Sequence, residues 1–270
     1  MPINADLNGK QYVLGKGRIF FDRYPTGVAL TAATQGLGER YIGNTPEFTT
    51  SSSSENLDHY DSDSGVKVKD DSVQLSFDRT GKLVTDSIST ENLALLFLGE
   101  RSTITQTAST GLTTTVTAKR GMFYQLGASE SLPQGVRKVT SVVVTKGAGF
   151  TTPVTMSGNY QVDEDLGRIY IEDDAVAIND EAIQITFNTL ASTREVVISG
   201  STPIYGALRL VSDNPKGANR DYFFPYVKLA PDGDYALKGE EWQQIGFQFE
   251  ILKKATSVEA AYVDGRATVV

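Results

Sequence analysis

Few residues of this chain could carry out chemistry, and they gather around one histidine. His59 is the only histidine, and it lies in a polar segment beside Asp58 and Asp61 with several serines nearby. A Ser-His-Asp arrangement could in principle be assembled from these residue types. A histidine in so polar a stretch is more often simply solvated, so we predict that the protein is not an enzyme.

The acidic and glycine-containing motifs favour no cofactor and no metal. The run Asp61-Ser-Asp63-Ser-Gly65 is similar to a calcium loop. In an EF-hand, however, the glycine stands at position 6 and a glutamate closes the loop at position 12, where this chain has Ser72. Gly15-Lys16-Gly17 lacks the rest of either nucleotide-binding motif. Adjacent carboxylates elsewhere lie in polar turns, as expected of a solvated surface.

The elements that position these residues are predicted from residue 41 to residue 98. Strands are expected at Tyr41–Thr50 and Ser72–Asp86; in the second, Val73, Leu75 and Phe77 alternate with polar residues, which is typical of a strand with one covered face. A buried helix is expected at Thr90–Leu98, with Ser89 as its N-cap and Gly99 as its left-handed stop.

The segment between the two strands, Ser51–Asp71, is predicted to be a long loop. Loops of this length inside compact domains are usually functional or disordered. It carries both signs of charge, so it could bind a neighbour or another copy through complementary patches. The residues that we expect to make such contacts are Ser53, Glu55, Asp58, His59, Asp61, Asp63, Lys67 and Lys69.

The rest of the chain consists of short predicted strands separated by turn signals, which favours a mainly β sandwich or barrel with one flanking α-helix. Residues 119–199 have their own pattern of short strands. We therefore predict a discontinuous core, residues 1–118 and 200–270, interrupted by a small β-rich insertion at 119–199. The tail from Val258 onward is expected to be loosely ordered.

Composition excludes several function classes. The chain has 270 residues, a formal net charge of −8 and no cysteine. The acidic balance argues against a surface that holds nucleic acid, which needs clustered Lys and Arg. The absence of cysteine excludes disulfides and thiol chemistry. No apolar run approaches the length of a membrane helix, and the first residues show no apolar signal region, so we expect neither membrane insertion nor export.

Two stretches, about two fifths of the chain, carry a resemblance to a known family. They are GERYIGNTPEFTTSSSSENLDHYDSDSGVKVKDDSVQLSFDRTGKLVTDSISTENLALLFLG, residues 38–99, and GALRLVSDNPKGANRDYFFPYVKLAPDGDYALKGEEWQQIGFQFEIL, residues 206–252. Their order is strand, Ser/Asp-rich loop, strand, capped helix and then a strand after GEEW. This order resembles the major tail tube proteins of long-tailed, siphovirus-type bacteriophages, although no single short motif is diagnostic.

The resemblance implies a structural subunit of the virion tail, assembled in the host bacterial cytoplasm. Six copies would close into a ring, and rings would stack into a hollow tube that conducts viral DNA without binding it specifically. The long loop would reach the adjacent ring. Other implied partners are the tape measure protein, the tail terminator and the tail-tip proteins. Residues 119–199 would project from the outer face.

An acidic lumen would repel DNA within a Debye length of about 8 Å at physiological salt. Glu47 and Asp78 point away from the apolar face of their strands by alternation, so they are our candidates for the lumen; an outer solvated face is the alternative position. A second function class also stays open. Tyrosines and Trp242 could form a stacking platform for carbohydrate, as in a receptor-binding module of a tail tip or fibre.

Overall fold

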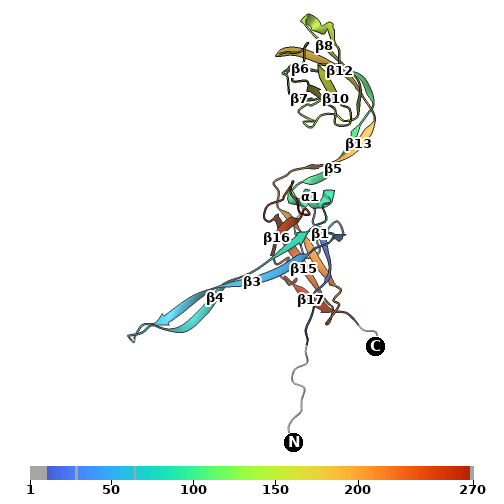
Figure 1. Cartoon of the computed structure of the whole chain (residues 1–270). Coiled ribbons are helices and arrows are strands. Elements are labelled where there is room, and N and C mark those ends of the chain that lie inside the picture. Colours follow the sequence, from blue (N-terminus) through green and yellow to red (C-terminus); the bar gives the residue numbers. More distant parts are fainter. Residues whose placement is uncertain (1–10, 28–29, 64, 268–270) are drawn as a thin grey trace. The chain divides into compact units, whose positions relative to one another are not determined.

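The chain is described here by a computed structural model that covers residues 11–27, 30–63 and 65–267 (Figure 1). The protein is mainly β, with 52% strand and 4% helix. This composition confirms the expected fold class. A single α-helix, α1 (Thr90–Leu96), is present in the described part of the chain.

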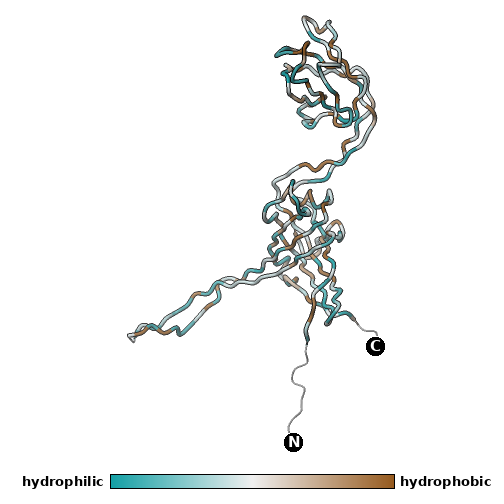
Figure 2. The backbone as a smooth tube through the Cα atoms, viewed as in Figure 1, coloured by the Kyte–Doolittle hydropathy of each residue, from teal (hydrophilic) through white to brown (hydrophobic). Residues whose placement is uncertain are grey.

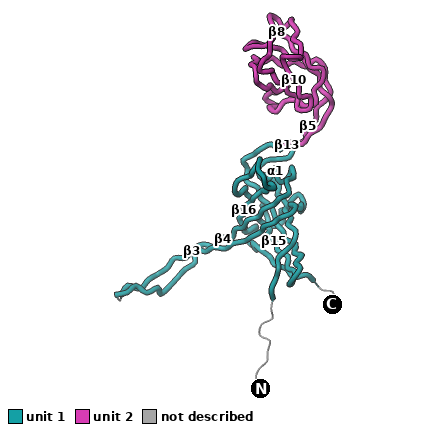
Figure 3. The backbone as a smooth tube through the Cα atoms, in the orientation of Figure 1, with its two compact units in different colours: residues 1–101, 197–270 teal, residues 102–196 magenta. Residues whose placement is uncertain are grey.

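The chain divides into two compact units (Figure 3). Unit 1 comprises residues 1–101 and 197–270, and unit 2 comprises residues 102–196. The boundary that we expected at residue 119 is wrong, because the strand Ser109–Ala118 pairs with Glu181–Thr189 of the inserted unit. This Thr-rich strand gives no local signal of its distant partner.

Unit 1 is built on one eight-stranded antiparallel sheet. Seven of its strands follow the order β2-β1-β14-β15-β16-β4-β3, and β17 pairs with β15 off this path. Their bounds are β1 (Gly17–Arg23), β2 (Arg40–Tyr41), β3 (Glu47–Asp61), β4 (Val68–Thr85), β14 (Ile204–Ser212), β15 (Arg220–Pro231), β16 (Ile245–Ile251) and β17 (Tyr262–Gly265).

One face of this sheet carries the core of unit 1. Strand β16 alternates fully, with Ile245, Phe247, Phe249 and Ile251 buried and the polar residues between them more exposed. Helix α1 packs against β15 and β16 and adds Leu95 to the same cluster. The opposite face, called the polar face below, carries Lys82, Lys228 and Glu250 together with the stacked rings of Tyr205 and Tyr226. The tail is more ordered than expected, since β17 pairs with β15.

The ends of α1 follow from local chemistry. Ser89 is the N-cap, as predicted, and its hydroxyl accepts a hydrogen bond from the Asn92 amide at 3.1 Å. The predicted stop at Gly99 is wrong by one residue, because the left-handed residue is Leu98, with φ of 49°. Gly99 is needed for a different reason: a Cβ there would lie 1.9 Å from the carbonyl oxygen of Ile198.

The segment that we predicted as a long loop, Ser51–Asp71, is instead mostly strand. Strands β3 and β4 pair from Glu47↔Val84 out to Asp61↔Val68, and only residues 62–67 connect them. The sequence does not show this ladder because residues 51–61 are nearly all polar and their apolar members, Leu57 and Tyr60, are three positions apart. The alternation with a period of two that indicates a strand is therefore missing. Figure 1 shows this hairpin extending beyond the rest of unit 1.

Unit 2 is a separate β structure with its own core. One sheet has the order β10-β11-β7 and the other β6-β12-β8-β9, and a single buried cluster draws on both. The chain enters along β5 (Glu100–Gln106) and leaves along β13 (Ser192–Ile198), which pair with each other. The remaining bounds are β6 (Ser109–Ala118), β7 (Phe123–Gln125), β8 (Val139–Lys146), the 3-10 helix η1 (Ala148–Phe150), β9 (Thr152–Val154), β10 (Tyr160–Asp163), β11 (Arg168–Ile171) and β12 (Glu181–Thr189).

Candidate assembly surface

The outer part of the β3–β4 hairpin, residues 52–78, is called the arm below. Every described side chain of the arm is exposed except for half-buried Asp58 and Ser76. Ten residues of β3 run from Ser52 to Asp61, which at about 3.3 Å per residue gives a reach of roughly 33 Å. The backbone groups that face the partner strand are satisfied by cross-strand pairing. The side chains of the arm contact solvent and one another, and the described residues outside the hairpin do not bury them.

The arm carries all eight residues that we predicted as contact residues. Ser53, Glu55, Asp58, His59 and Asp61 lie on β3, and Lys69 lies on β4. Asp63 and Lys67 lie in the connection. The extended ladder distributes these residues along a rod rather than gathering them in one patch.

The middle of the arm is held by a charged cross-strand cluster. The Asp58 carboxylate lies 2.6 Å from the Lys69 ammonium and accepts a hydrogen bond from the Ser72 hydroxyl at 2.7 Å. The hydrogen bond from Lys69, followed by that from Ser72, lowers the pKa of Asp58. The same contact raises the pKa of Lys69. Because the pair is partly exposed to solvent, it contributes little to stability. Its main effect is to fix which residues of the two strands lie opposite each other.

His59 contacts a carboxylate on the opposite strand. Its Nδ1 lies 2.6 Å from an Asp70 carboxylate oxygen, and the histidine side chain is 73% exposed. The nearby Ser72 hydroxyl donates to Asp58 instead. Of the calcium-like run, Asp61 accepts a hydrogen bond from the Asp63 amide, and Ser64 lies outside the described residues. Within the described ranges, no group of three or more His, Asp or Glu residues is placed to hold a metal ion.

Apolar side chains also lie along the arm, and no described residue outside the arm buries them, although we expected them to be covered. Leu57 and Val73 are directly opposite each other and are 63% and 56% exposed. Leu75 and Phe77 are exposed too, and the Arg79 guanidinium lies over the Phe77 ring. Figure 2 shows hydrophobic stretches, coloured brown, that interrupt a mainly hydrophilic hairpin. The alternation in β4 thus indicates a face that unit 1 itself leaves uncovered.

Glu47 and Asp78 share one face of the hairpin. Glu47 is opposite Val84 and Asp78 is opposite Ser53, with no shift in register between these pairs. This face is the continuation of the polar face of the sheet. Cations lie on it as well: Lys82 pairs with Asp232 at 2.7 Å, and Lys228 pairs with Glu250 at 3.3 Å. The polar face is therefore mixed in charge rather than uniformly acidic.

Strand β3 forms an edge of the unit 1 sheet. It pairs with β4 on one side, and no strand in the described ranges pairs with its other side. At the other end of the order, β2 covers β1 with only two residues, Arg40 and Tyr41. Unpaired edges are templates for pairing with another chain unless they are blocked. A second copy could extend the sheet at either end.

Unit 2 presents an aromatic patch of its own. The Phe123 and Tyr170 rings lie 4.6 Å apart on adjacent strands, and the Arg168 guanidinium lies 5.1 Å from the Phe123 centroid. Phe123 is 58% exposed. On the next strand, Gln161 donates a hydrogen bond to Glu172. Sequence reasoning missed this patch, because its members come from three separate strands. Trp242, which we considered for such a platform, lies in unit 1 and is 93% exposed.

Comparison with known proteins assigns the chain to a family. Residues 12–263 match the model of the family described as Protein of unknown function UCP028589. The chain belongs to this family. The match includes the arm, the unit 1 sheet except the end of β17, and all of unit 2. No curated protein matches the chain. No helix in the described ranges is long and apolar enough to span a membrane.

Proposed function

We propose that the protein is a structural subunit of a bacteriophage tail tube, without catalytic activity. Copies would close into hexameric rings, and rings would stack into a hollow tube that conducts viral DNA. The observation that carries this proposal is the arm: a two-stranded ribbon, exposed on both faces, with apolar side chains that no described residue outside the arm buries. Isolated hairpins are marginally stable in water, so such an arm is suited to packing on a neighbouring copy.

The edges of the unit 1 sheet support lateral closure. Pairing of the β3 edge of one copy with the β1–β2 end of the next would repeat around a ring and leave no free edge. The polar face, with Glu47 and Asp78, would then line the lumen. Its ion pairs neutralise part of its charge, so a duct of this kind would neither hold DNA firmly nor repel it strongly.

The proposal includes partners and location implied by the resemblance of residues 38–99 and 206–252 to tail tube proteins. The main partner is the chain itself. The tape measure protein, the tail terminator and the tail-tip proteins are further partners, and the place of action is the virion tail after assembly in the bacterial cytoplasm.

Electron microscopy of the purified, concentrated chain tests this function. We expect rings or stacked tubes. Ser53 and Asp78 are directly opposite, so residues 54–77 can be replaced by Asn-Gly, a dipeptide suited to a two-residue hairpin. This armless chain should keep its fold by circular dichroism and should fail to stack. A wild-type chain that stays monomeric at high concentration, even with an initiating tail-tip complex, contradicts the proposal.

The aromatic patch of unit 2 favours one other function, a receptor- or carbohydrate-binding module of a tail tip or fibre. Exposed rings beside amide and carboxylate groups suit the stacking and hydrogen bonding of a sugar. Glycan-array binding that is lost in Phe123→Ala, by a chain that never assembles, would favour this alternative. The matched control is Phe97→Ala, because Phe97 is also a partly exposed ring and lies outside unit 2.

A further inference from the structure

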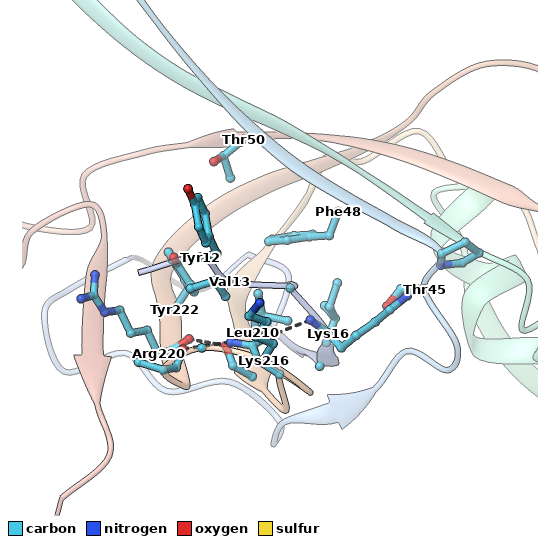
Figure 4. A pocket seen from close by; sticks show the side chains of 18 of the residues that line it. Tyr12, Val13, Lys16, Thr45, Phe48, Thr50, Leu210, Lys216, Arg220 and Tyr222 are labelled. Atoms are coloured by element: carbon cyan, nitrogen blue, oxygen red, sulfur yellow. Dashed lines mark hydrogen bonds between the residues drawn. The ribbon is translucent and has the colours of Figure 1, made fainter. Parts of the chain in front are cut away.

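A groove in unit 1 lies beside the base of the arm (Figure 4). It has a volume of about 950 Å³ and is bounded by the segment from Gln11 to Gly17, by β3 at Phe48 and Thr50, and by the ends of β14 and β15. Figure 4 shows Phe48 and Thr50 on one side and Leu210 and Tyr222 on the other. Helix α1 covers the neighbouring part of the same sheet face, so the groove is the part of the core face that remains open.

The groove is basic in a chain that is acidic overall. Three cations line it, Lys16, Lys216 and Arg220, and no aspartate or glutamate is among its lining residues. None of the three forms an ion pair with another residue of the described ranges. Phe48 and Leu210 add apolar surface to the lining. An occupant should therefore be acidic with a few apolar side chains.

The arm has this composition. Residues 52–78 carry seven carboxylates and two lysines, and the apolar residues Leu57, Val66 and Val73 are exposed among them. Near the tip, Asp61 and Asp63 have no cationic partner in the described part of the chain. The charges of the arm and of the groove are thus complementary in sign.

The arm cannot fill the groove of its own chain. Thr50, which lines the groove, and Asp61, near the tip, lie on the same continuous strand β3. Eleven residues of extended strand separate them by roughly 36 Å. Contact between an arm and a groove must therefore join two copies through different surfaces. When the rotation that relates one copy to the next does not close a ring, contacts of this kind build an open-ended stack of copies.

We infer that the groove is the docking site for the tip of the arm of a second copy. This inference rests on the proposed function and names the surface that the arm would contact. Asp61 and Asp63 of one copy would approach Lys216 and Arg220 of the next, and exposed apolar residues of the arm would cover Phe48 and Leu210. The contact is directional, so it stacks copies in one order.

Two variant chains test this contact without requiring tubes. The armless chain keeps the groove, and the Lys216→Glu, Arg220→Glu chain keeps the arm. Neither should associate with itself through this contact, but together they should form a one-to-one complex in analytical ultracentrifugation. Like charges brought together at an interface cost several kcal/mol, so we expect the charge-reversed chain to bind wild-type arms at least about tenfold more weakly than an unaltered groove does.

Two further variants supply the matched controls. Asp61→Lys with Asp63→Lys should restore binding to the charge-reversed groove. Lys119→Glu with Lys238→Glu, which changes two exposed lysines outside the groove, should alter nothing. Because the chain has no cysteine, Ser62→Cys and Thr45→Cys on separate chains should cross-link selectively with a short bis-maleimide. Ser62→Cys with Ser129→Cys in unit 2 should not.

The outcomes separate this inference from the proposed function. If the charge-reversed chain forms tubes normally, or if the one-to-one complex is absent, the groove is not the docking site. The tail tube proposal is unaffected by either result. If no tubes form but the one-to-one complex does, the tail tube proposal is wrong and the groove is still the docking site of the arm. If deletion of residues 2–10 is required before the groove binds an arm, the native occupant is the chain's own N-terminal segment and the inference is wrong.

Discussion

One buried polar side chain, Asn92, connects separate parts of unit 1 through its hydrogen bonds. Asn92 is fully buried; its amide nitrogen donates to the carbonyls of Ile42 and Ser87, and its amide oxygen accepts from the Arg40 guanidinium. Burial is the main reason that the pKa of Arg40 is lowered. One side chain thus ties the first turn of the helix to the segment around β2, and a buried amide is tolerated only because its hydrogen bonds are made.

The arm gives a pH prediction at the same scale. Because the pKa of Asp58 is lowered chiefly by the hydrogen bond from Lys69, the pair supports the folded arm above the usual carboxyl pKa of 3.8. That support is lost as the pH falls through the lower, folded value. Replacing Lys69→Met should raise the pKa of Asp58 toward 3.8 in an NMR titration. Lys67→Met is the control and should leave it unchanged; equal shifts in both variants would contradict the assigned cause.

Sequence patterns predicted residues well where the signal was local. Ser89 was identifiable as a cap from its type and its position before an apolar run. The role of Asn92 was not, because its partners are distant in sequence. The burial of the predicted apolar helix is only partial, since Phe97 is 44% exposed. Eight arm residues were assigned to one surface segment, but the sequence does not indicate how the two strands pair, because the register shifts twice along the ladder.

At the scale of elements, the hairpin changes character along its length. Near its base, β4 is part of the sheet, and Gly81 sits between Thr50 on β3 and Phe249 on β16. Farther out, beyond the end of β16, the two strands have only each other. The predicted loop was wrong here for a physical reason: a segment as polar as residues 51–61 forms a strand only when pairing, rather than burial, holds it.

Gly81 lies where the hairpin joins the sheet, and its neighbours leave no room for a side chain. A Cβ at this position would lie 2.2 Å from the Phe249 ring and 2.5 Å from the Thr49 carbonyl oxygen. Gly81→Ala should therefore lower the free energy of unfolding of unit 1 by about 1–3 kcal/mol, as overpacked cores do. Urea denaturation measures this. Gly65→Ala, where a Cβ meets nothing within 4 Å, is the control, and equal stability of both variants would refute the argument.

For the whole molecule, the division into two cores governs stability. The buried cluster of unit 1 and that of unit 2 share no residue. The pattern of short strands in the sequence predicted an insertion. The predicted end, residue 199, lies close to residue 196, where unit 2 ends. The predicted start was too late, because β6 becomes part of the insertion only through its pairing with β12, more than sixty residues onward.

Calorimetry should resolve two unfolding transitions. Phe187 is 1% exposed in the core of unit 2, and Phe187→Ala should destabilise that unit by about 3–5 kcal/mol. Only one transition should move to lower temperature. Val176→Ala, at an 88% exposed position of the same unit, should move neither. A single transition that shifts as a whole would mean that the units unfold together.

The segments that flank unit 2 are held together by unit 1. Gly99 lies so close to Ile198 that no side chain fits between them, and the Gly200 amide donates to the Phe97 carbonyl at 3.0 Å. Since these ends already meet, connecting them by a longer or shorter piece of chain changes the loop-closure entropy only slightly. We therefore expect that residues 102–196 can be replaced by a different domain, or deleted, between Arg101 and Val197 during evolution, and that unit 1 would keep its fold.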